Sequence, residues 1–130
     1  MRSHRHQFRV IYGDTDMMGV VYYGNYFRYF EAGRSEFLRA IGLPYSLIED
    51  AGYMLPISEA SARYHASAKY DDLLTLETTL DELRRASLRM TYRLTRDEEL
   101  IATGQTTQAC LNPQGRLTRI PDLLREKLTP

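Results

Sequence analysis

The hydrophobic and polar positions of the chain change their spacing near Asn25, from simple alternation to recurrence every three or four residues. The second spacing places apolar side chains on one face of a helix and charged side chains largely on the other. It predicts a helix over residues 25–41, with Asn25 as N-cap and Gly42 just beyond the end. The expected apolar side consists of Tyr26, Phe27, Phe30, Gly33, Phe37, Leu38 and Ile41.

Gly33 lies in the middle of this apolar side. A glycine inside a helix costs up to about 1 kcal/mol relative to alanine, because its backbone loses more conformational freedom on folding. Such a cost is expected where another element packs against the helix at very short range. We therefore expect another element to approach the helix closely at Gly33.

Most of the remaining chain alternates apolar and polar residues, which is typical of half-buried antiparallel strands. The alternation predicts strands over residues 8–12, 55–68, 74–80, 88–94 and 100–111. Turns are expected at residues 84–86, 96–98 and 112–115. A short helix is expected over residues 44–51, with Pro44 in its first position, and a last helical turn or two within residues 121–128.

An antiparallel sheet with one apolar face needs a cover, and the helix over residues 25–41 is the only long one available. The predicted fold class is therefore α+β, with a five- or six-stranded antiparallel sheet curled around this central helix. A length of 130 residues predicts that residues 1–130 form a single domain. Strands at the edges of such a sheet invite pairing with a second copy of the chain.

The net charge and the cysteine content narrow the classes of function that the protein can have. The 17 Lys and Arg residues equal the 17 Asp and Glu residues, which argues against a dedicated nucleic-acid binder and makes a homo-oligomer unsurprising. Cys110 is the only cysteine, so no intrachain disulfide can form. The chain shows no signal peptide and no apolar stretch of membrane-spanning length, and we expect it in the cytoplasm.

The segment over residues 12–26 carries the chemistry. It places two acids, three glycines and four tyrosines between an extended segment and the long helix. A carboxylate thus lies near the backbone N–H groups of a helix start. That pairing suits acyl chemistry, in which one group attacks or deprotonates and the other receives the negative charge that develops on a carbonyl oxygen.

The stretch GDTDMMGVVYYGNYFRYFEAGRSEFLR, residues 13–39, resembles the signature of the 4-hydroxybenzoyl-CoA thioesterase family of hot-dog-fold acyl-CoA thioesterases. The second aspartate, the glycine three residues later, Val-Val-Tyr and Asn-Tyr all match. The resemblance implies a hot-dog fold and dimers with a continuous sheet, often paired as dimers of dimers, with active sites between subunits. Tyr23 replaces the histidine of the Tol–Pal-associated branch and favours the 4-hydroxybenzoyl-CoA branch, and Ser67 replaces a proline that is frequent in the family.

The resemblance implies that Asp16 is catalytic. Because a thioester carbonyl is already electrophilic, one carboxylate can suffice, as nucleophile through a mixed anhydride or as general base on water. The backbone N–H of Tyr23 is the implied oxyanion donor, and Gly24 would let the substrate approach the backbone. Tyr12 could orient Asp16 or the acyl group, whereas Asp14 is expected to brace the loop.

In the same family, basic residues near one hairpin meet the phosphates and nucleotide of coenzyme A. Here the matching residues are Arg84, Arg85 and Ser87. The guanidinium group suits phosphate, because its planar fork donates two hydrogen bonds at once. The resemblance thus implies an acyl-CoA substrate, with coenzyme A as part of it and no separate cofactor. No clustering of His, Cys and carboxylate residues in the sequence suggests a metal site.

Two alternatives stay open. The fold could hold an acyl-CoA or acyl-carrier-protein thioester without cleaving it, although a pure binder has no need of Asp16. A hydratase or dehydratase usually needs a histidine with a carboxylate, and no histidine lies in or next to the signature loop. We expect His65, in a strand of small residues, to be a packed and hydrogen-bonded group.

Overall fold

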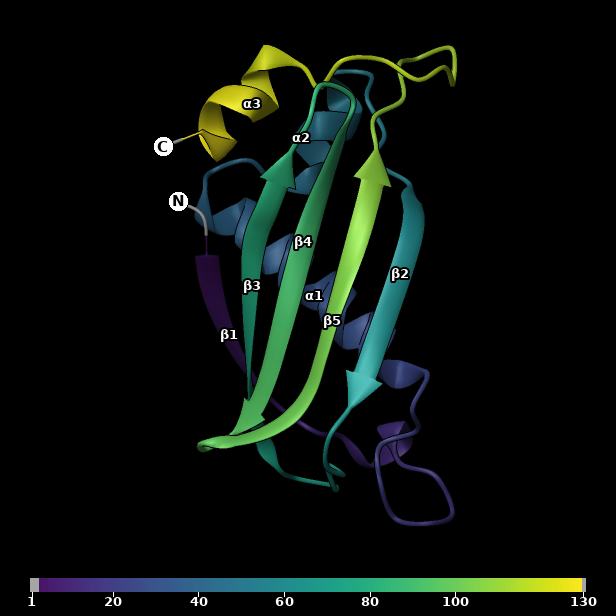
Figure 1. The fold of residues 1–130 in the computed structure, drawn as a ribbon, viewed down its shortest axis with the longest axis vertical. Helices are drawn as coiled ribbons and strands as arrows, with labels where there is room; N and C mark the ends of the chain where they lie inside the picture. Colours follow the sequence, from purple (N-terminus) through teal and green to yellow (C-terminus); the bar gives the residue numbers. More distant parts are fainter. Residues whose placement is uncertain (1–2, 130) are drawn as a thin grey trace.

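The computed structural model describes residues 3–129 and consists of one antiparallel sheet with helices (Figure 1). The sheet has five strands in the order β1-β3-β4-β5-β2. Their bounds are Ser3–Arg9 for β1, Ile57–Tyr64 for β2, Leu73–Leu83 for β3, Ser87–Arg96 for β4 and Glu99–Ala109 for β5. The helices are α1 (Asn25–Ala40), α2 (Tyr45–Asp50) and α3 (Asp122–Leu128), with a 3-10 turn, η1, at Tyr12–Asp14. This confirms the predicted α+β architecture.

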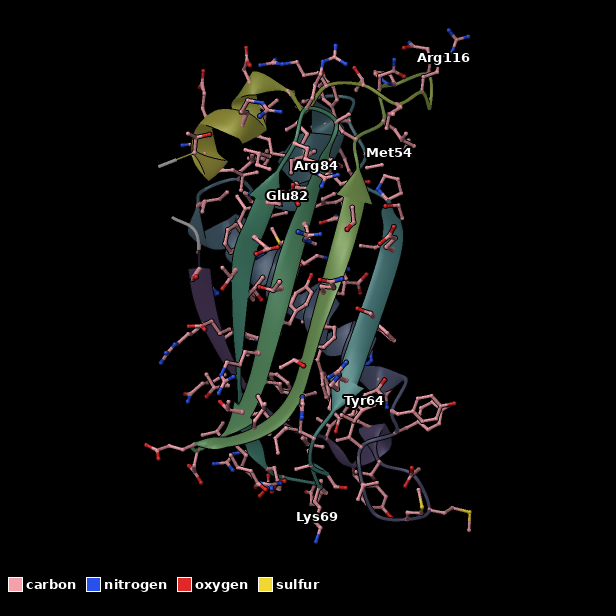
Figure 2. All side chains as sticks on the ribbon, viewed as in Figure 1. Met54, Tyr64, Lys69, Glu82, Arg84 and Arg116 are labelled. Atoms are coloured by element: carbon pink, nitrogen blue, oxygen red, sulfur yellow. The ribbon has the colours of Figure 1, made fainter. Side chains whose placement is uncertain are left out.

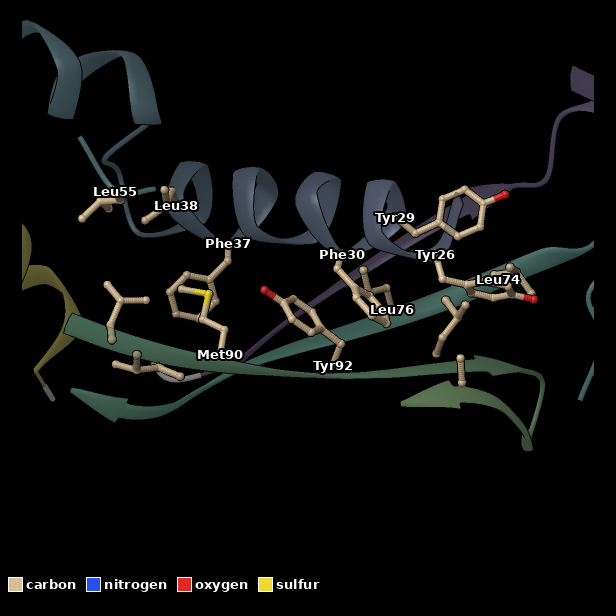
Figure 3. Packing of buried hydrophobic residues seen from close by; sticks show 14 of the residues in the cluster. Tyr26, Tyr29, Phe30, Phe37, Leu38, Leu55, Leu74, Leu76, Met90 and Tyr92 are labelled. Atoms are coloured by element: carbon tan, nitrogen blue, oxygen red, sulfur yellow. The ribbon is translucent and has the colours of Figure 1, made fainter. Parts of the chain in front are cut away.

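Helix α1 lies along one face of the sheet, and its Tyr26, Phe30 and Phe37 side chains point toward the strands (Figure 3). Phe30 is fully buried and stacks on Tyr92 of β4, with ring centroids 4.4 Å apart and an interplanar angle of 9°. The expected close approach at Gly33 is confirmed. A Cβ atom there would lie 2.5 Å from Leu76 Cδ2 and 2.6 Å from Thr78 Oγ1, both on β3. Helix and sheet thus touch where the helix has no side chain.

The predicted start of the long helix is wrong in one detail. Gly24 occupies the N-cap position, and Asn25 is the first helical residue. The Asn25 side chain donates instead to the carbonyl oxygen of Asp14, at 2.9 Å, and so ties the helix to the preceding loop. At the other end Gly42 has a φ of +81°, which suits the predicted position of a glycine just after the helix.

The first strand is also placed differently from the prediction. Strand β1 ends at Arg9, and Tyr12 begins a 3-10 turn rather than continuing the strand. Beyond Arg9 the chain leaves the sheet, because the N–H groups of Asp14 and Thr15 bond back to the carbonyl oxygens of Ile11 and Tyr12, both at 3.1 Å. Alternation therefore continues in the sequence past the point where the strand ends.

The apolar side of α1 includes a residue that periodicity missed. Tyr29 is only 4% exposed, whereas Phe27, which was expected to face the core, is 37% exposed. The reason is the edge strand β1: Phe8 packs on the Tyr29 ring at a centroid distance of 4.6 Å and so covers the side of the helix facing that edge.

We predict that Gly104→Ala lowers the free energy of unfolding by about 1–3 kcal/mol through overpacking. A Cβ atom at Gly104 of β5 would lie 2.4 Å from the Phe30 ring and 2.8 Å from the Ser61 carbonyl oxygen of β2. The ring has no room to retreat, because it is stacked on Tyr92. Chemical denaturation measures the change. Gly13→Ala is the control, since a Cβ there meets nothing within 4 Å, and equal stability of the two variants would contradict the prediction.

Candidate active site

The loop before α1 is anchored by a buried carboxylate, that of Asp14. It accepts a hydrogen bond from the Tyr29 hydroxyl at 2.9 Å and forms an ion pair with Arg28, both from the first turns of α1. The Asp14 carbonyl oxygen also accepts the Tyr22 N–H at 3.0 Å. Burial and the Asp14 carboxylate raise the pKa of Tyr29, so its hydroxyl keeps the proton that it donates. The expected bracing role of Asp14 is thus confirmed.

Asp16 occupies a different environment two residues later. Its side chain is half-buried, and Oδ1 accepts the Met18 N–H at 2.9 Å, which closes an Asx turn. Its own N–H donates to the Val20 carbonyl oxygen at 2.9 Å. Within residues 3–129 no side-chain or backbone donor bonds to the second carboxylate oxygen. The loop therefore holds the Asp16 carboxylate in place while leaving one oxygen available for chemistry.

Asp16 lines a cavity with a volume of about 470 Å³. The loop forms one wall, and the end of β2 with the residues after it forms the other. Asp16 is the only acid among the lining residues, and the other walls are mainly apolar or aromatic. The lining residues are Asp16, Met18, Val20, Val21, Tyr23, Tyr26, Tyr64, His65, Ala66 and Ser67.

The start of α1 offers unpaired donors beside this cavity. The Tyr22 carbonyl oxygen accepts the Asn25 N–H at 2.9 Å, and the Tyr23 carbonyl oxygen accepts the Tyr26 N–H at 3.4 Å. By contrast, the N–H groups of Tyr23 and Gly24 donate to no described residue. They are orphan donors of a helix N-terminus, where the helix dipole adds positive potential. The arrangement suits a negatively charged oxygen.

The wall opposite the loop is held by Arg96. Its Nη1 donates to the Ser67 carbonyl oxygen at 3.0 Å and to the Asp72 carboxylate at 2.6 Å. Burial opposes ionisation of Asp72, but the Lys69 N–H and the Arg96 guanidinium outweigh it and lower the pKa of Asp72 below its ordinary value. The N–H of His65 bonds to the Ile101 carbonyl oxygen at 2.8 Å. Both walls of the cavity are therefore fixed by charged or backbone hydrogen bonds.

Two predicted site residues lie outside the cavity lining. Tyr12 is 77% exposed and packs edge-on against Tyr70, with ring centroids 5.7 Å apart. At Gly24 a Cβ atom would lie 2.9 Å from the Tyr22 ring, so the space left by the glycine is taken by that ring. Of the residues proposed for the loop, the structure brings Asp16 and Tyr23 together.

The three residues proposed for coenzyme A lie at the other end of the sheet, as the positions of Arg84 and Tyr64 in Figure 2 show. Arg84 and Ser87 line a separate hollow of about 140 Å³, where Arg84 Nε bonds to Glu82 Oε1 at 2.7 Å. Arg85 is exposed, and its carbonyl oxygen accepts the Ile120 N–H at 2.8 Å. A single chain does not bring these residues to Asp16.

Sequence reasoning gave no role in the site to two residues that line the cavity, Tyr64 and His65. His65 was expected to be packed and hydrogen-bonded. It is exposed, with Nε2 3.2 Å from Thr103 Oγ1, so only the hydrogen bond is confirmed. The contact of these residues with the loop cannot be predicted from local sequence. It depends on where β2 ends relative to a loop that comes much earlier in the chain, since Tyr64 and Tyr23 are 41 positions apart.

An antiparallel sheet around one long helix, with a carboxylate-lined cavity at the helix start, defines a hot-dog thioester hydrolase. Residues 10–128 match the Thioesterase-like superfamily, and the chain belongs to it. A crystal structure of a hypothetical protein from Aquifex aeolicus superimposes with a TM-score of 0.94 at 32% identity, over 97% of this chain and 99% of that one.

Two named relatives are about one third identical to this chain over the aligned residues. An acyl-CoA thioesterase, YbgC, from Haemophilus influenzae is 33% identical over 105 residues, which are 80% of this chain and 77% of the relative. A 4-hydroxybenzoyl-CoA thioesterase from Pseudomonas sp. strain CBS-3 is 34% identical over 98 residues, or 73% and 70% of the two chains. The identities of this chain to these two relatives are nearly equal.

None of the helices within residues 3–129 is both long enough and apolar enough to cross a membrane. No group of three or more His, Cys, Asp and Glu side chains in that part of the chain is arranged to hold a metal ion. Cys110 is buried in the core.

We predict that Asp14→Asn lowers the free energy of unfolding by about 1–3 kcal/mol, because it weakens a buried charge-assisted hydrogen bond with Tyr29 and removes the ion pair with Arg28. Chemical denaturation measures the loss. Asp16→Asn is the matched control in the same loop: its amide oxygen can still accept the Met18 N–H, so stability should change by less than about 0.5 kcal/mol. Equal losses in the two variants would contradict the assigned division of roles.

Proposed function

We propose that the protein hydrolyses an acyl-CoA thioester to a carboxylic acid and free coenzyme A. The observation that carries the proposal is the Asp16 carboxylate in an aromatic-lined cavity, next to the unpaired Tyr23 N–H at the start of α1. The names of the relatives support the class of substrate: one is an acyl-CoA thioesterase and the other a 4-hydroxybenzoyl-CoA thioesterase.

Two routes use the same groups. In one, an Asp16 oxygen adds to the thioester carbon, the thiolate of coenzyme A leaves, and water then hydrolyses the resulting mixed anhydride. In the other, Asp16 takes a proton from a water molecule as its oxygen adds to that carbon, and the thiolate leaves afterwards. In both, the Tyr23 N–H donates to the oxygen that becomes negative. The carboxylate oxygen without a described partner is the one available to act.

We further propose that the active enzyme is a homo-oligomer, a dimer or a dimer of dimers, in the cytoplasm. Strand β2 is a sheet edge, and seven of its eight residues are exposed even though it pairs with β5. Such an edge offers a row of unpaired backbone groups to a second copy. In this arrangement Arg84, Arg85 and Ser87 would meet the coenzyme A bound at the partner's Asp16, which one chain alone cannot achieve.

One contact favours the alternative of a thioester-binding protein without turnover. Asp16 Oδ1 accepts the Met18 N–H, so the residue has a structural use apart from catalysis. A binder could keep the aspartate for that turn alone. A change that removes the Asp16 charge but keeps this turn therefore separates the two functions: it should lower turnover in a thioesterase and should matter little to a binding protein.

We predict that Asp16→Asn lowers kcat at least about a hundred-fold while affinity for a non-hydrolysable thioether analogue of acyl-CoA is kept, because the amide preserves the turn but neither attacks nor deprotonates. Thiol release from a panel of acyl-CoA substrates, followed with a thiol dye, measures turnover. Asp50→Asn, an exposed aspartate at the end of α2, is the control. Turnover within about tenfold of wild type would overturn the role of Asp16. Wild-type binding without turnover would favour the binding protein.

We predict that the double change Arg84→Ala and Arg85→Ala raises the KM for acyl-CoA about 3- to 30-fold and leaves kcat unchanged, because the guanidinium groups would bind phosphate far from the reacting carbon. The matching acyl-pantetheine thioester, which lacks the nucleotide, should show no change in KM. Arg5→Ala is the control, since Arg5 is also an exposed arginine paired with a glutamate, at 3.2 Å from Glu77. Equal effects on the two substrates would contradict nucleotide binding by this hairpin.

A further inference from the structure

We infer that Tyr64 is a positioning residue for the proposed oxyanion donor. Its hydroxyl holds the peptide carbonyl of Tyr23, so that the first turn of α1 keeps its unpaired N–H groups in place during the reaction. The inference rests on the proposed thioesterase function and adds to it a residue from a distant strand. It concerns the support of the donor, not the donor itself.

The contact is a hydrogen bond from the Tyr64 hydroxyl to the Tyr23 carbonyl oxygen, at 3.1 Å. The only other described donor to this oxygen is the Tyr26 N–H, at 3.4 Å. That distance exceeds the usual range of about 2.7–3.2 Å for N–H···O bonds. The helix by itself therefore holds the Tyr23 carbonyl weakly, and the Tyr64 hydroxyl is its shorter partner.

Fixing this carbonyl also fixes the donors on either side of it. A peptide unit is planar and trans, so the direction of the Tyr23 carbonyl sets the direction of the Gly24 N–H in the same unit. The Tyr23 N–H belongs to the preceding unit, whose Tyr22 carbonyl oxygen accepts the Asn25 N–H at 2.9 Å. The two units meet at the Cα atom of Tyr23, so the hydrogen bond from Tyr64 restricts how they are turned against each other. Neither N–H group has a described partner of its own, so each is held in direction only through the carbonyl oxygen of its own peptide unit.

Tyr64 is well placed for this task because the sheet holds it. It is the last residue of β2, it pairs with Ala102 of β5, and the next residue, His65, bonds through its N–H to the Ile101 carbonyl oxygen at 2.8 Å. Its ring lies 5.1 Å from the ring of Tyr26. Figure 2 shows Tyr64 at the end of β2, next to the loop that precedes α1. The hydrogen bond thus ties the segment just before α1 to a residue that the sheet holds in place.

The test is Tyr64→Phe, which removes the hydroxyl and keeps the ring. We expect kcat for the best acyl-CoA substrate to fall about tenfold, since loss of an oxyanion donor itself costs about a hundred- to a thousand-fold and here the donor is only loosened. KM should stay within about twofold. The midpoint of thermal unfolding should stay within about 2 °C of wild type, because an exposed hydrogen bond contributes little to stability.

Tyr45→Phe is the matched control. The Tyr45 hydroxyl also bonds to the backbone, accepting the Leu55 N–H at 3.0 Å, but it lies outside the cavity lining. Its loss should leave both kcat and KM unchanged. A fall in kcat as large as that of Tyr64→Phe would show that loss of any such hydroxyl disturbs the enzyme, and it would overturn the inference.

Two coenzyme A analogues separate positioning from packing. A trifluoromethyl ketone in place of the thioester forms a tetrahedral adduct that needs the oxyanion donor, whereas a thioether has no carbonyl oxygen. Tyr64→Phe should bind the ketone about tenfold more weakly and the thioether equally well. Weaker binding of both analogues, or a raised KM with kcat retained, would make Tyr64 a simple contact of the acyl group and overturn the inference.

Failure of the inference is distinct from failure of the proposed function. If the wild-type protein releases no thiol from any acyl-CoA, then the thioesterase proposal itself is wrong, and this inference is overturned with it. If the wild-type protein releases thiol and Tyr64→Phe does so at the same kcat, then only the role of Tyr64 is overturned.

Discussion

The long helix α1 can lie flat against the sheet only because a glycine, which has no side chain, occupies one side of each of two close contacts between them. Gly33 of α1 leaves room for Leu76 and Thr78, and Gly104 of β5 leaves room for the Phe30 ring. These two contacts set the height of the helix above the sheet along its length. The position of the helix start, and hence of its N–H groups without a described partner, follows from this packing rather than from the loop alone.

The loop then has to be fastened to the helix start, and a buried carboxylate does this. Asp14 binds Tyr29 and Arg28 of α1 through its carboxylate, and Tyr22 and Asn25 through its carbonyl oxygen. One residue thereby joins the two ends of the loop to the helix. The Tyr64 hydroxyl adds a second attachment from the sheet side. The cavity lies between these attachments, and its shape depends on both.

Periodicity was sufficient to predict the sheet, the long helix and the need for close packing at Gly33, since these follow from which side chains must leave water. Periodicity failed where contacts with distant parts of the chain decide where a strand ends or which residue is buried. Alternation continued through Tyr12 although the strand ends at Arg9, and Tyr29 is buried by Phe8 of an edge strand that the helical pattern cannot foresee. Asp16 and Tyr23 could be proposed from the signature loop, whereas Tyr64 joins them only through a contact across 41 positions. Local sequence carries no information on such a contact.

Two aspartates in one loop illustrate how environment divides their roles. Asp14 is 6% exposed and has its carboxylate oxygens occupied by a hydroxyl and a guanidinium, so attack on a substrate would first require breaking contacts that hold the loop. Asp16 uses one oxygen for the turn at Met18, has no described donor on the other, and lines a cavity of about 470 Å³. An oxygen that is fixed in direction but free of donors needs no rearrangement before it meets a carbonyl carbon. The chemical difference between the two residues thus arises from what their neighbours have already bonded.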